Sequence, residues 1–402
     1  MKSDAITLPL TVDDEAGDTA TIPSFSNIAA IIVAHCAGML DLVALPLWIG
    51  SLTTTYKFDP QQAGGLVTCF LLGVVLSSCY VAPRLDRIRQ RFAVPAGYAV
   101  SALALGACAF VTQYQVLVGL HLVAGVAVGC SLSVTHGVVG LSRNPHRLFA
   151  MAGLALGVFA IAFVVFTPNA VLRYGGDALF KVFAIVMLVT AAVTAVAFPS
   201  SGTNGRVSAR DNAKLSKSVW LGMLGVSCIA LNQSIIFSFV MRIGLDRGFG
   251  MAAVTSVLVA LGFVNLIPAP LAALLQRRVS ARAVLTIGPL VQAGLALSIS
   301  NSTVFAPYAM AASIFSAVVI FTHTFAFGML ANIDKSGRAV AATPVMLMTG
   351  AAIGPILAGT LVKSFGYGSL GTITIVIAII ASTCFLRAAR VLGSGTPPSG
   401  AI

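Results

Sequence analysis

Charge is what this chain has least of. Only 9% of its 402 residues are Lys, Arg, Asp or Glu, 58% are hydrophobic, and the mean hydropathy is +0.97. About a quarter of the residues of a soluble protein are charged, because a large polar surface has to face water. The shortage of charge therefore excludes a soluble enzyme of this length and predicts a membrane protein with many crossings.

Motifs that would carry chemistry are missing too. The seven cysteines fall in apolar runs, without a CxxC pair or histidines at ligand spacing, so we expect small buried side chains and no metal site or cofactor. HExxH, GxSxG and paired intramembrane aspartates are absent, which leaves an intramembrane enzyme or a membrane sensor as a remote alternative. Despite the net charge of +12, no segment is dense enough in Lys and Arg to bind nucleic acid.

Long apolar runs are what the chain has instead. A helix needs about 20 apolar residues to cross a bilayer, and the sequence contains twelve such runs, so we expect an all-α integral membrane protein. The acidic segment before the first run is not a cleavable signal peptide. The runs cover about residues 28–52, 62–82, 93–111, 116–140, 148–170, 179–198, 219–241, 251–275, 283–300, 304–331, 339–362 and 370–387.

The chain divides near its middle. Residues 199–218 are rich in Gly, Ser and basic residues, as in a linker between two domains. We therefore expect a tail at 1–27, a six-helix bundle at 28–198, the linker, a second six-helix bundle at 219–387, and a tail at 388–402.

Basic residues predict the orientation, because cytoplasmic loops retain Lys and Arg. The tails, the linker and every second loop hold all but six of the 24 basic residues, so we expect both tails in the cytoplasm and the chain in the cytoplasmic (inner) membrane. The basic excess then reflects topology and not a binding site. The six on the other side are Lys57, Arg173, Lys181, Arg242, Arg247 and Lys363.

The two halves repeat one another. Five pairs of identical residues align in one ungapped register of 191 positions that also aligns the crossings. This predicts two pseudo-symmetric six-helix bundles, the parallel repeat arrangement that alternating-access carriers use. The pairs are Phe58 and Phe249, Arg87 and Arg278, Arg91 and Arg282, Gly97 and Gly288, and Arg147 and Arg338.

Two loops carry a family pattern. Residues 82–91 read APRLDRIRQR, in which Asp86, Arg87 and Arg91 match the motif G-x-L-x-D-R-x-G-R-R between crossings two and three; Asp334 and Arg338 belong to a D-x-x-G-R pattern between crossings ten and eleven. The chain thus resembles the major facilitator superfamily of twelve-helix secondary transporters. The resemblance implies that these five residues latch a cytoplasmic gate and that the protein is a monomer. The alternative is that the two aspartates only cap helices.

Glycines are spaced regularly in two crossings. Crossing eleven carries Gly350, Gly354 and Pro355, which we interpret as a packing or hinge device, since glycine permits close contact and proline kinks a helix. Crossing five has Gly153 and Gly157 without the proline that follows in antiporters of the family, which weakens an antiporter assignment.

One carboxylate lies inside a crossing. Asp41 is the only acidic residue within the twelve runs, and a charged aspartate at a helix centre costs about 2.5–3.5 kcal/mol. Small side chains on its helical face leave space, so we predict a proton carrier in a cavity whose access alternates. The alternative is a protonated aspartate that bonds a neighbouring helix. His121 lies about where the family carries an intramembrane arginine, and we expect it to assist proton transfer.

Other polar groups inside the crossings are candidates for a substrate cavity. The 191-residue register places Asn232 opposite Asp41, which suits a site for solute and proton between the halves. The alternatives are neutral, fully bonded histidines and polar contacts between helices. The candidates are Trp48, His136, Asn232, Gln233, Asn265 and His323.

No Lys or Arg lies near the middle of any crossing, which disfavours strong organic anions as substrates. We therefore expect a carrier and not an enzyme, one that moves a neutral, weakly acidic or cationic organic solute across the bilayer by alternating access, coupled to protons. A proton-driven efflux pump for drugs or metabolites and an uncoupled uniporter are the alternatives.

Overall fold

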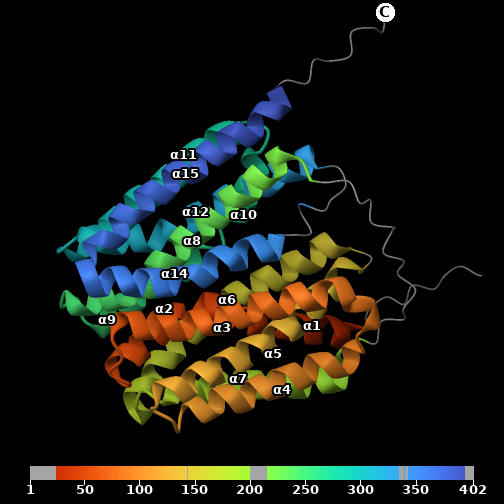
Figure 1. Cartoon of the computed structure of the whole chain (residues 1–402), viewed down its shortest axis with the longest axis vertical. Helices are drawn as coiled ribbons and strands as arrows, with labels where there is room; N and C mark the ends of the chain where they lie inside the picture. Colours follow the sequence, from red (N-terminus) through yellow and green to blue (C-terminus); the bar gives the residue numbers. More distant parts are fainter. Residues whose placement is uncertain (1–23, 143, 200–214, 335–338, 340–342, 394–402) are drawn as a thin grey trace, which may run out of the picture.

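A computed structural model describes residues 24–142, 144–199, 215–334, 339 and 343–393 (Figure 1). All regular elements in these ranges are helical, and twelve spans of 19 to 30 residues are long and apolar enough to cross a membrane. The prediction of twelve crossings in an all-helical protein is therefore confirmed.

The first half contributes six spans to the fold. The first span consists of two helices that meet at Met39, and the second ends in a 3₁₀ turn. The elements are α1 (Phe25–Gly38), α2 (Leu40–Thr54), α3 (Pro60–Val81), η1 (Ala82–Arg87), α4 (Gln90–Cys108), α5 (Tyr114–Gly140), α6 (Pro145–Tyr174) and α7 (Ala178–Ala197).

The second half contributes the other six spans. Here the second span of the half, and not the first, is divided, between Val264 and Pro268. The elements are α8 (Lys217–Asp246), α9 (Met251–Val264), α10 (Pro268–Leu275), α11 (Ala281–Asn301), α12 (Phe305–Ile333), α14 (Thr343–Phe365) and α15 (Gly368–Gly393).

Helix starts follow local capping chemistry. Asp59 accepts a hydrogen bond from the Gln62 backbone N–H, and the Gln62 side chain accepts one from the Asp59 N–H, so the two form a capping box before α3. Pro60 occupies the first helical position, where no N–H is needed. The Ser280 hydroxyl caps α11 in the same way as the Asp59 carboxylate caps α3.

The two halves repeat contacts as well as residues. A methyl group on Gly97 would lie 2.1 Å from the Ser131 Oγ, and one on Gly288 would lie 2.3 Å from the Thr322 Oγ1, so α4 approaches α5 about as closely as α11 approaches α12. Phe58 and Phe249 each meet an aromatic ring edge-on at 5.5 Å, namely Tyr114 and Phe305. All of these pairs are 191 residues apart, as the sequence register requires.

The two halves meet along three helix pairs, α3 with α14, α2 with α8, and α6 with α9. We call the end that holds Ala197 and Lys217 the linker end, and the opposite end the closed end. In Figure 1 the first half lies below and the second above, and α8 diverges from α2 toward the linker end.

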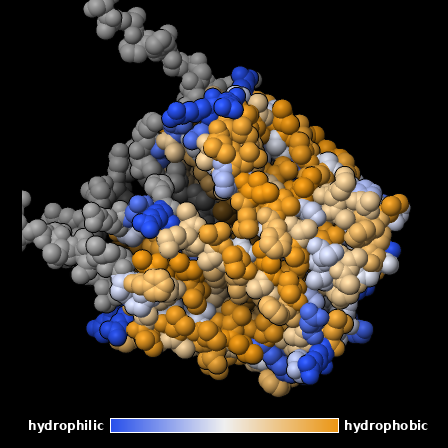
Figure 2. Space-filling view, turned by 180° about the vertical axis from the view of Figure 1, so that it is seen from behind, coloured by the Kyte–Doolittle hydropathy of each residue, from blue (hydrophilic) through white to orange (hydrophobic). Residues whose placement is uncertain are grey.

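Most of the surface in Figure 2 is apolar, as a bilayer requires, and a recess is visible between the halves near the linker end.

Candidate functional site

The seal at the closed end is a contact between backbones. A methyl group on Gly64 of α3 would lie 2.0 Å from the carbonyl oxygen of Pro355 on α14, and one on Gly359 would lie 2.1 Å from the carbonyl oxygen of Pro60. The Thr68 hydroxyl donates to the Ala352 carbonyl (2.8 Å) and accepts from the Ile356 N–H (3.1 Å). Only glycine permits so close an approach, so α3 and α14 fit together in a single register.

The predicted packing residues of α14 lie on two sides of that helix. Pro355 faces α3, whereas Gly350 and Gly354 face α8, where methyl groups would lie 2.1 Å from the Ser227 carbonyl oxygen and 2.4 Å from the Ser234 side chain. The helix α14 therefore packs between α3 of the first half and α8 of its own half.

An ion pair joins the halves beyond this seam. Lys363 of α14 lies 2.8 Å from the Asp59 carboxylate and 3.3 Å from the Gln61 side-chain oxygen. Partial burial alone would raise the pKa of Asp59, but the hydrogen bonds from Lys363 and from the backbone N–H groups of Gln62 and Gln61, with the lysine charge, hold it below its usual range.

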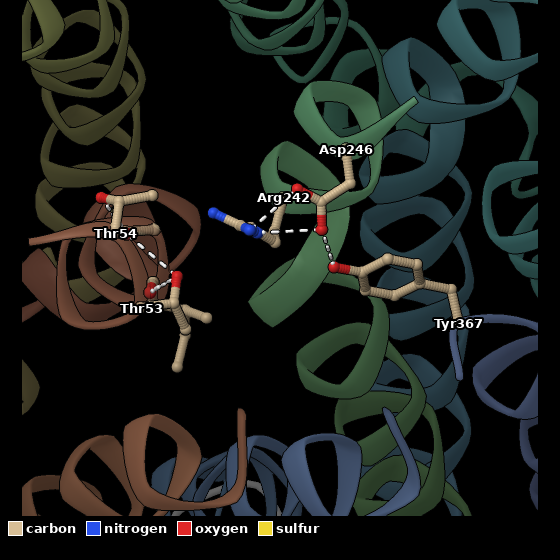
Figure 3. A network of polar contacts seen from close by, with 7 residues as sticks. Thr53, Thr54, Arg242, Asp246 and Tyr367 are labelled. Atoms are coloured by element: carbon tan, nitrogen blue, oxygen red, sulfur yellow. Dashed lines mark hydrogen bonds and ion pairs between the residues drawn. The ribbon is translucent and has the colours of Figure 1, made fainter. Parts of the chain in front are cut away.

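A second polar cluster lies at the same end. Arg242 pairs with Asp246 one turn later on α8, at 2.9 Å, and the Tyr367 hydroxyl donates to the same carboxylate. Burial and the Asp246 carboxylate raise the pKa of Tyr367. Figure 3 shows the Arg242 guanidinium directed toward Thr53 and Thr54 at the end of α2, in the other half. The closed end therefore carries polar groups of both halves, one ion pair of which crosses between them.

The carboxylate predicted to carry the proton lies next to a helix break. Asp41 is in the first turn of α2, directly after the break at Met39. The Tyr98 hydroxyl of α4 donates to the Ala34 carbonyl, and a methyl group on Gly38 would lie 2.6 Å from Leu132 of α5. These contacts occupy the last turn of α1 and explain why it ends there.

Asp41 is buried without a counter-charge. Its side chain is 4% exposed and lies by the backbone N–H groups of Asp41 itself and Leu42. Within the described residues, no Lys, Arg or His comes within ion-pair distance of it. The Leu42 N–H also donates to the Met39 carbonyl (3.2 Å), at the point where the two helices meet.

Trp48 shows where the Asp41 face points. Seven residues return a helix to nearly the same face, and Trp48 packs on Phe70 of α3 and Phe183 of α7, with ring centroids 5.1 and 4.8 Å away. At 1% exposure, Trp48 lies in the core of the first bundle in this conformation. The Asp41 face likewise turns toward the interior of the first bundle.

His121 is a fully bonded core histidine. Its Nδ1–H donates to the Leu117 carbonyl (2.8 Å) and its Nε2 accepts from the Trp48 indole N–H (3.3 Å), so both ring nitrogens are used by one neutral tautomer. The ring is 0% exposed. The structure does not bring it within bonding distance of Asp41, and this geometry corresponds to the alternative of a bonded neutral histidine.

The amides of α8 bond within the second bundle. Asn232 donates to the Thr374 carbonyl of α15 (3.1 Å) and Gln233 donates to the Ser316 hydroxyl of α12 (2.7 Å). Both side-chain oxygens are buried without a partner. Asn232 and Asp41 therefore occupy equivalent positions of the two halves without forming a shared site here.

His136 has a partner that we did not predict from the sequence. Its Nε2 lies 3.0 Å from the Nδ1 of His35 on α1, and its ring packs against Phe149 of α6 at 5.6 Å. The two histidines are 101 positions apart on different helices, so no local pattern links them. Between them they hold one hydrogen bond, which joins α1 to α5.

Two further cavity candidates have orphaned polar atoms. The Asn265 side-chain oxygen is buried without a partner at the end of α9, and the Nε2 of His323 is buried without one on α12. The His323 ring stacks on Phe327 at 5.7 Å. Both residues belong to the second bundle.

The gate candidates lie at the linker end. Arg87 and Arg91 are exposed, and neither forms an ion pair within the part of the chain that the structure describes. Asp334 accepts a hydrogen bond from the Ala339 N–H at 2.7 Å, as a cap would. The side chain of Asp86 and the whole of Arg338 lie outside the described residues.

The chain is similar to one known family in sequence and to solved structures in fold. Residues 30–333 match the family model described as Major Facilitator Superfamily. The chain is similar to a bacterial homologue of the human lysosomal transporter Spinster, inward-facing and unoccupied (12% identity, 92% of this chain and 98% of that chain, TM-score 0.70). It is also similar to the nucleoside transporter NupG (11% identity, 91% and 98%, TM-score 0.71). At these identities the structures share the fold. No curated protein matches the chain.

Proposed function

The chain belongs to the major facilitator superfamily and is a secondary transporter, and from this premise we propose that it couples the movement of a small organic solute to protons through Asp41. One observation carries the proposal: a carboxyl group that is 4% exposed and has no basic partner within ion-pair distance among the described residues. Stability alone would not favour such a group, because an apolar residue would avoid the cost of burying it.

Burial and hydration give this carboxyl group two states. An isolated charge in an apolar interior costs several kcal/mol, so the group is neutral, and carries a proton, while it is buried as it is here. Access to water in another conformation favours the ionised form, and the proton leaves. Loading and release would then follow the conformational cycle.

The direction of access follows from the orientation. With the linker and both tails in the cytoplasm, as the basic loops favour, the recess between the halves would lie on the cytoplasmic side, and the contact of α3 with α14 on the outer side. The seam at Gly64 and Thr68 and the pair of Asp59 with Lys363 all lie at the sealed end. The transport cycle would break these contacts whenever the outer side opens.

The substrate class follows from the charges that the spans lack. In the described spans Lys and Arg lie at helix ends, away from the middle of the bilayer, so nothing there would pair a strong anion. Neutral amides and histidines such as Gln233 and His323 are present instead. We propose a neutral, weakly acidic or cationic solute; a structurally similar protein is described as a nucleoside transporter, so nucleosides are a reasonable first group to test.

Reconstitution in liposomes with an internal pH dye tests the proposal. Wild type, Asp41→Asn and Asp41→Glu are compared with nucleosides, weak carboxylic acids and amines outside, and Asp177→Asn, at the closed end, serves as a matched control. We expect one solute group to drive proton movement in wild type and the control, loss of that movement in Asp41→Asn, and partial retention in Asp41→Glu.

Solute movement without protons in wild type, unchanged in Asp41→Asn, would establish a uniporter and overturn the proposal. Proton movement that persists in Asp41→Asn would show that another group carries the proton. The sign of the pH change under an imposed gradient separates an importer from an efflux pump.

A further inference from the structure

An apolar groove runs along the outer side of the second bundle. It has a volume of about 450 Å³ and is lined by residues of α9 to α12 and of the connection between α10 and α11, among them Ile267, Leu271, Val279, Ile287 and Ile314. Its size falls within the range of about 300–1,000 Å³ that is usual for ligand sites. Several of these side chains are largely exposed, so the groove opens to the bilayer.

Three arginines stand at one end of this groove. Arg277 and Arg278 lie between α10 and α11, and Arg282 lies in the first turn of α11; all three are exposed. Val279 and Ala283, which line the groove, directly follow Arg278 and Arg282 in the chain. The apolar groove and the basic cluster are therefore continuous, and the cluster lies at the linker end of the bundle.

No acidic partner of these arginines lies among the residues that the structure describes. Residues 247–333 contain no Asp or Glu at all, and none of the three arginines forms an ion pair among the described residues. Figure 2 shows hydrophilic residues at both ends of the molecule, the linker end among them, with a broad apolar face between. Positive charge at the level of the lipid headgroups, next to an apolar groove at the level of the acyl chains, is complementary to a molecule with an anionic headgroup and an apolar chain.

We propose that this groove and the cluster of Arg277, Arg278 and Arg282 bind an anionic phospholipid, with the phosphate at the arginines and an acyl chain in the groove. Each basic residue near an anionic lipid surface contributes about 1 kcal/mol, and the buried chain adds apolar contact that a free phosphate ion would lack. A zwitterionic lipid would bring an ammonium group toward the same arginines and lose part of the attraction.

Two variants separate the charge from the groove. Arg278→Gln with Arg282→Gln removes two charges beside the groove, and its matched control, Lys217→Gln with Arg387→Gln, removes two exposed charges at the same end of the same bundle. Ala283→Leu with Ala317→Leu fills the groove and leaves every charge in place.

Native mass spectrometry of the delipidated full-length protein measures binding directly, so the result does not depend on the proposed transport activity. Phosphatidylglycerol, phosphatidylcholine with the same acyl chains, and glycerol phosphate are the probes. We expect wild type and the charge control to prefer phosphatidylglycerol, the arginine variant to bind it about fivefold more weakly for each charge removed, and the groove variant to bind it more weakly as well.

Equal binding of the two lipids by wild type would overturn the proposal. If the groove-filled variant bound phosphatidylglycerol as well as wild type does, charge alone would explain the binding, and the proposal would be overturned. Full competition by glycerol phosphate would also overturn it, because the site would then bind phosphate alone. Thermal unfolding of each variant without lipid verifies that the arginine variant and the groove variant fold.

Discussion

Replacing Gly64 by alanine should open the closed end. The added methyl group would lie 2.0 Å from the Pro355 carbonyl oxygen and 2.6 Å from its carbonyl carbon. Both are backbone atoms in the middle of α14, so no side-chain rotation can relieve the contact. The two helices have to move apart, and with them the two halves at this end.

The size of the effect follows from the difference between two conformations. Overpacking costs about 1–3 kcal/mol, and here the cost applies only while α3 and α14 are in contact. The better helix propensity of alanine acts in both conformations and cancels. A differential energy of about 1–3 kcal/mol shifts the equilibrium by about 5- to 150-fold toward the state open at this end.

Distances between spin labels measure the shift. Thr112 and Thr303 are exposed, equivalent positions 191 residues apart, one in each half at the closed end; each is replaced by cysteine in a background free of other cysteines. Electron–electron resonance should show a larger population of long distances in Gly64→Ala. Gly153→Ala is the control, because nothing lies within 4 Å of a methyl group there. Identical distance distributions in the two variants would refute the reasoning.

Two other changes have defined outcomes. Asp59→Asn removes a partly exposed ion pair worth about 0.2–1 kcal/mol, so the same labels should report a ratio of closed to open states about 1.4- to 5-fold smaller, with Asp177→Asn unchanged. Since the pKa of Asp59 is lowered in this conformation, the wild-type contribution is present above about pH 4 and is lost as the pH falls through the lowered value. His121→Leu leaves the Trp48 N–H buried without an acceptor and should lower the free energy of unfolding by about 1–3 kcal/mol in denaturant titrations, with partial recovery in the double variant with Trp48→Phe. Loss of proton coupling in a stably folded His121→Leu protein would contradict the structural role.

The number and type of the elements could be predicted because a bilayer leaves few choices. Without water, a crossing segment must bond its backbone internally, so about 20 apolar residues specify a helix. The repeat of the two halves could also be predicted from the sequence. Gly97 and Gly288 are equivalent positions at which a neighbouring helix approaches too closely for a side chain. Length and spacing carry this information without any knowledge of tertiary contacts.

The direction in which each polar residue points could not be predicted in the same way. In a soluble helix the apolar face points inward, but in a membrane the core and the lipid-facing surface are both apolar. Trp48 therefore looked equally suited to a cavity and to the core, and only its contacts with Phe70 and Phe183 place it. Asn232 likewise shares a sequence register with Asp41 but bonds to α15.

The break in the first span shows most clearly what local sequence leaves open. A proline is the usual cause of a kink, yet Pro46 lies inside α2, while the chain breaks seven residues earlier, at Met39. The equivalent stretch of α8 is continuous. What distinguishes Met39 is tertiary: Tyr98 of α4 bonds the Ala34 carbonyl and Gly38 packs under Leu132 of α5. The N–H groups beside Asp41 thus depend on how α4 and α5 hold α1. If Asp41 carries the proton, its release requires a rearrangement within the first bundle, and separation of the two halves alone would leave the carboxyl group buried.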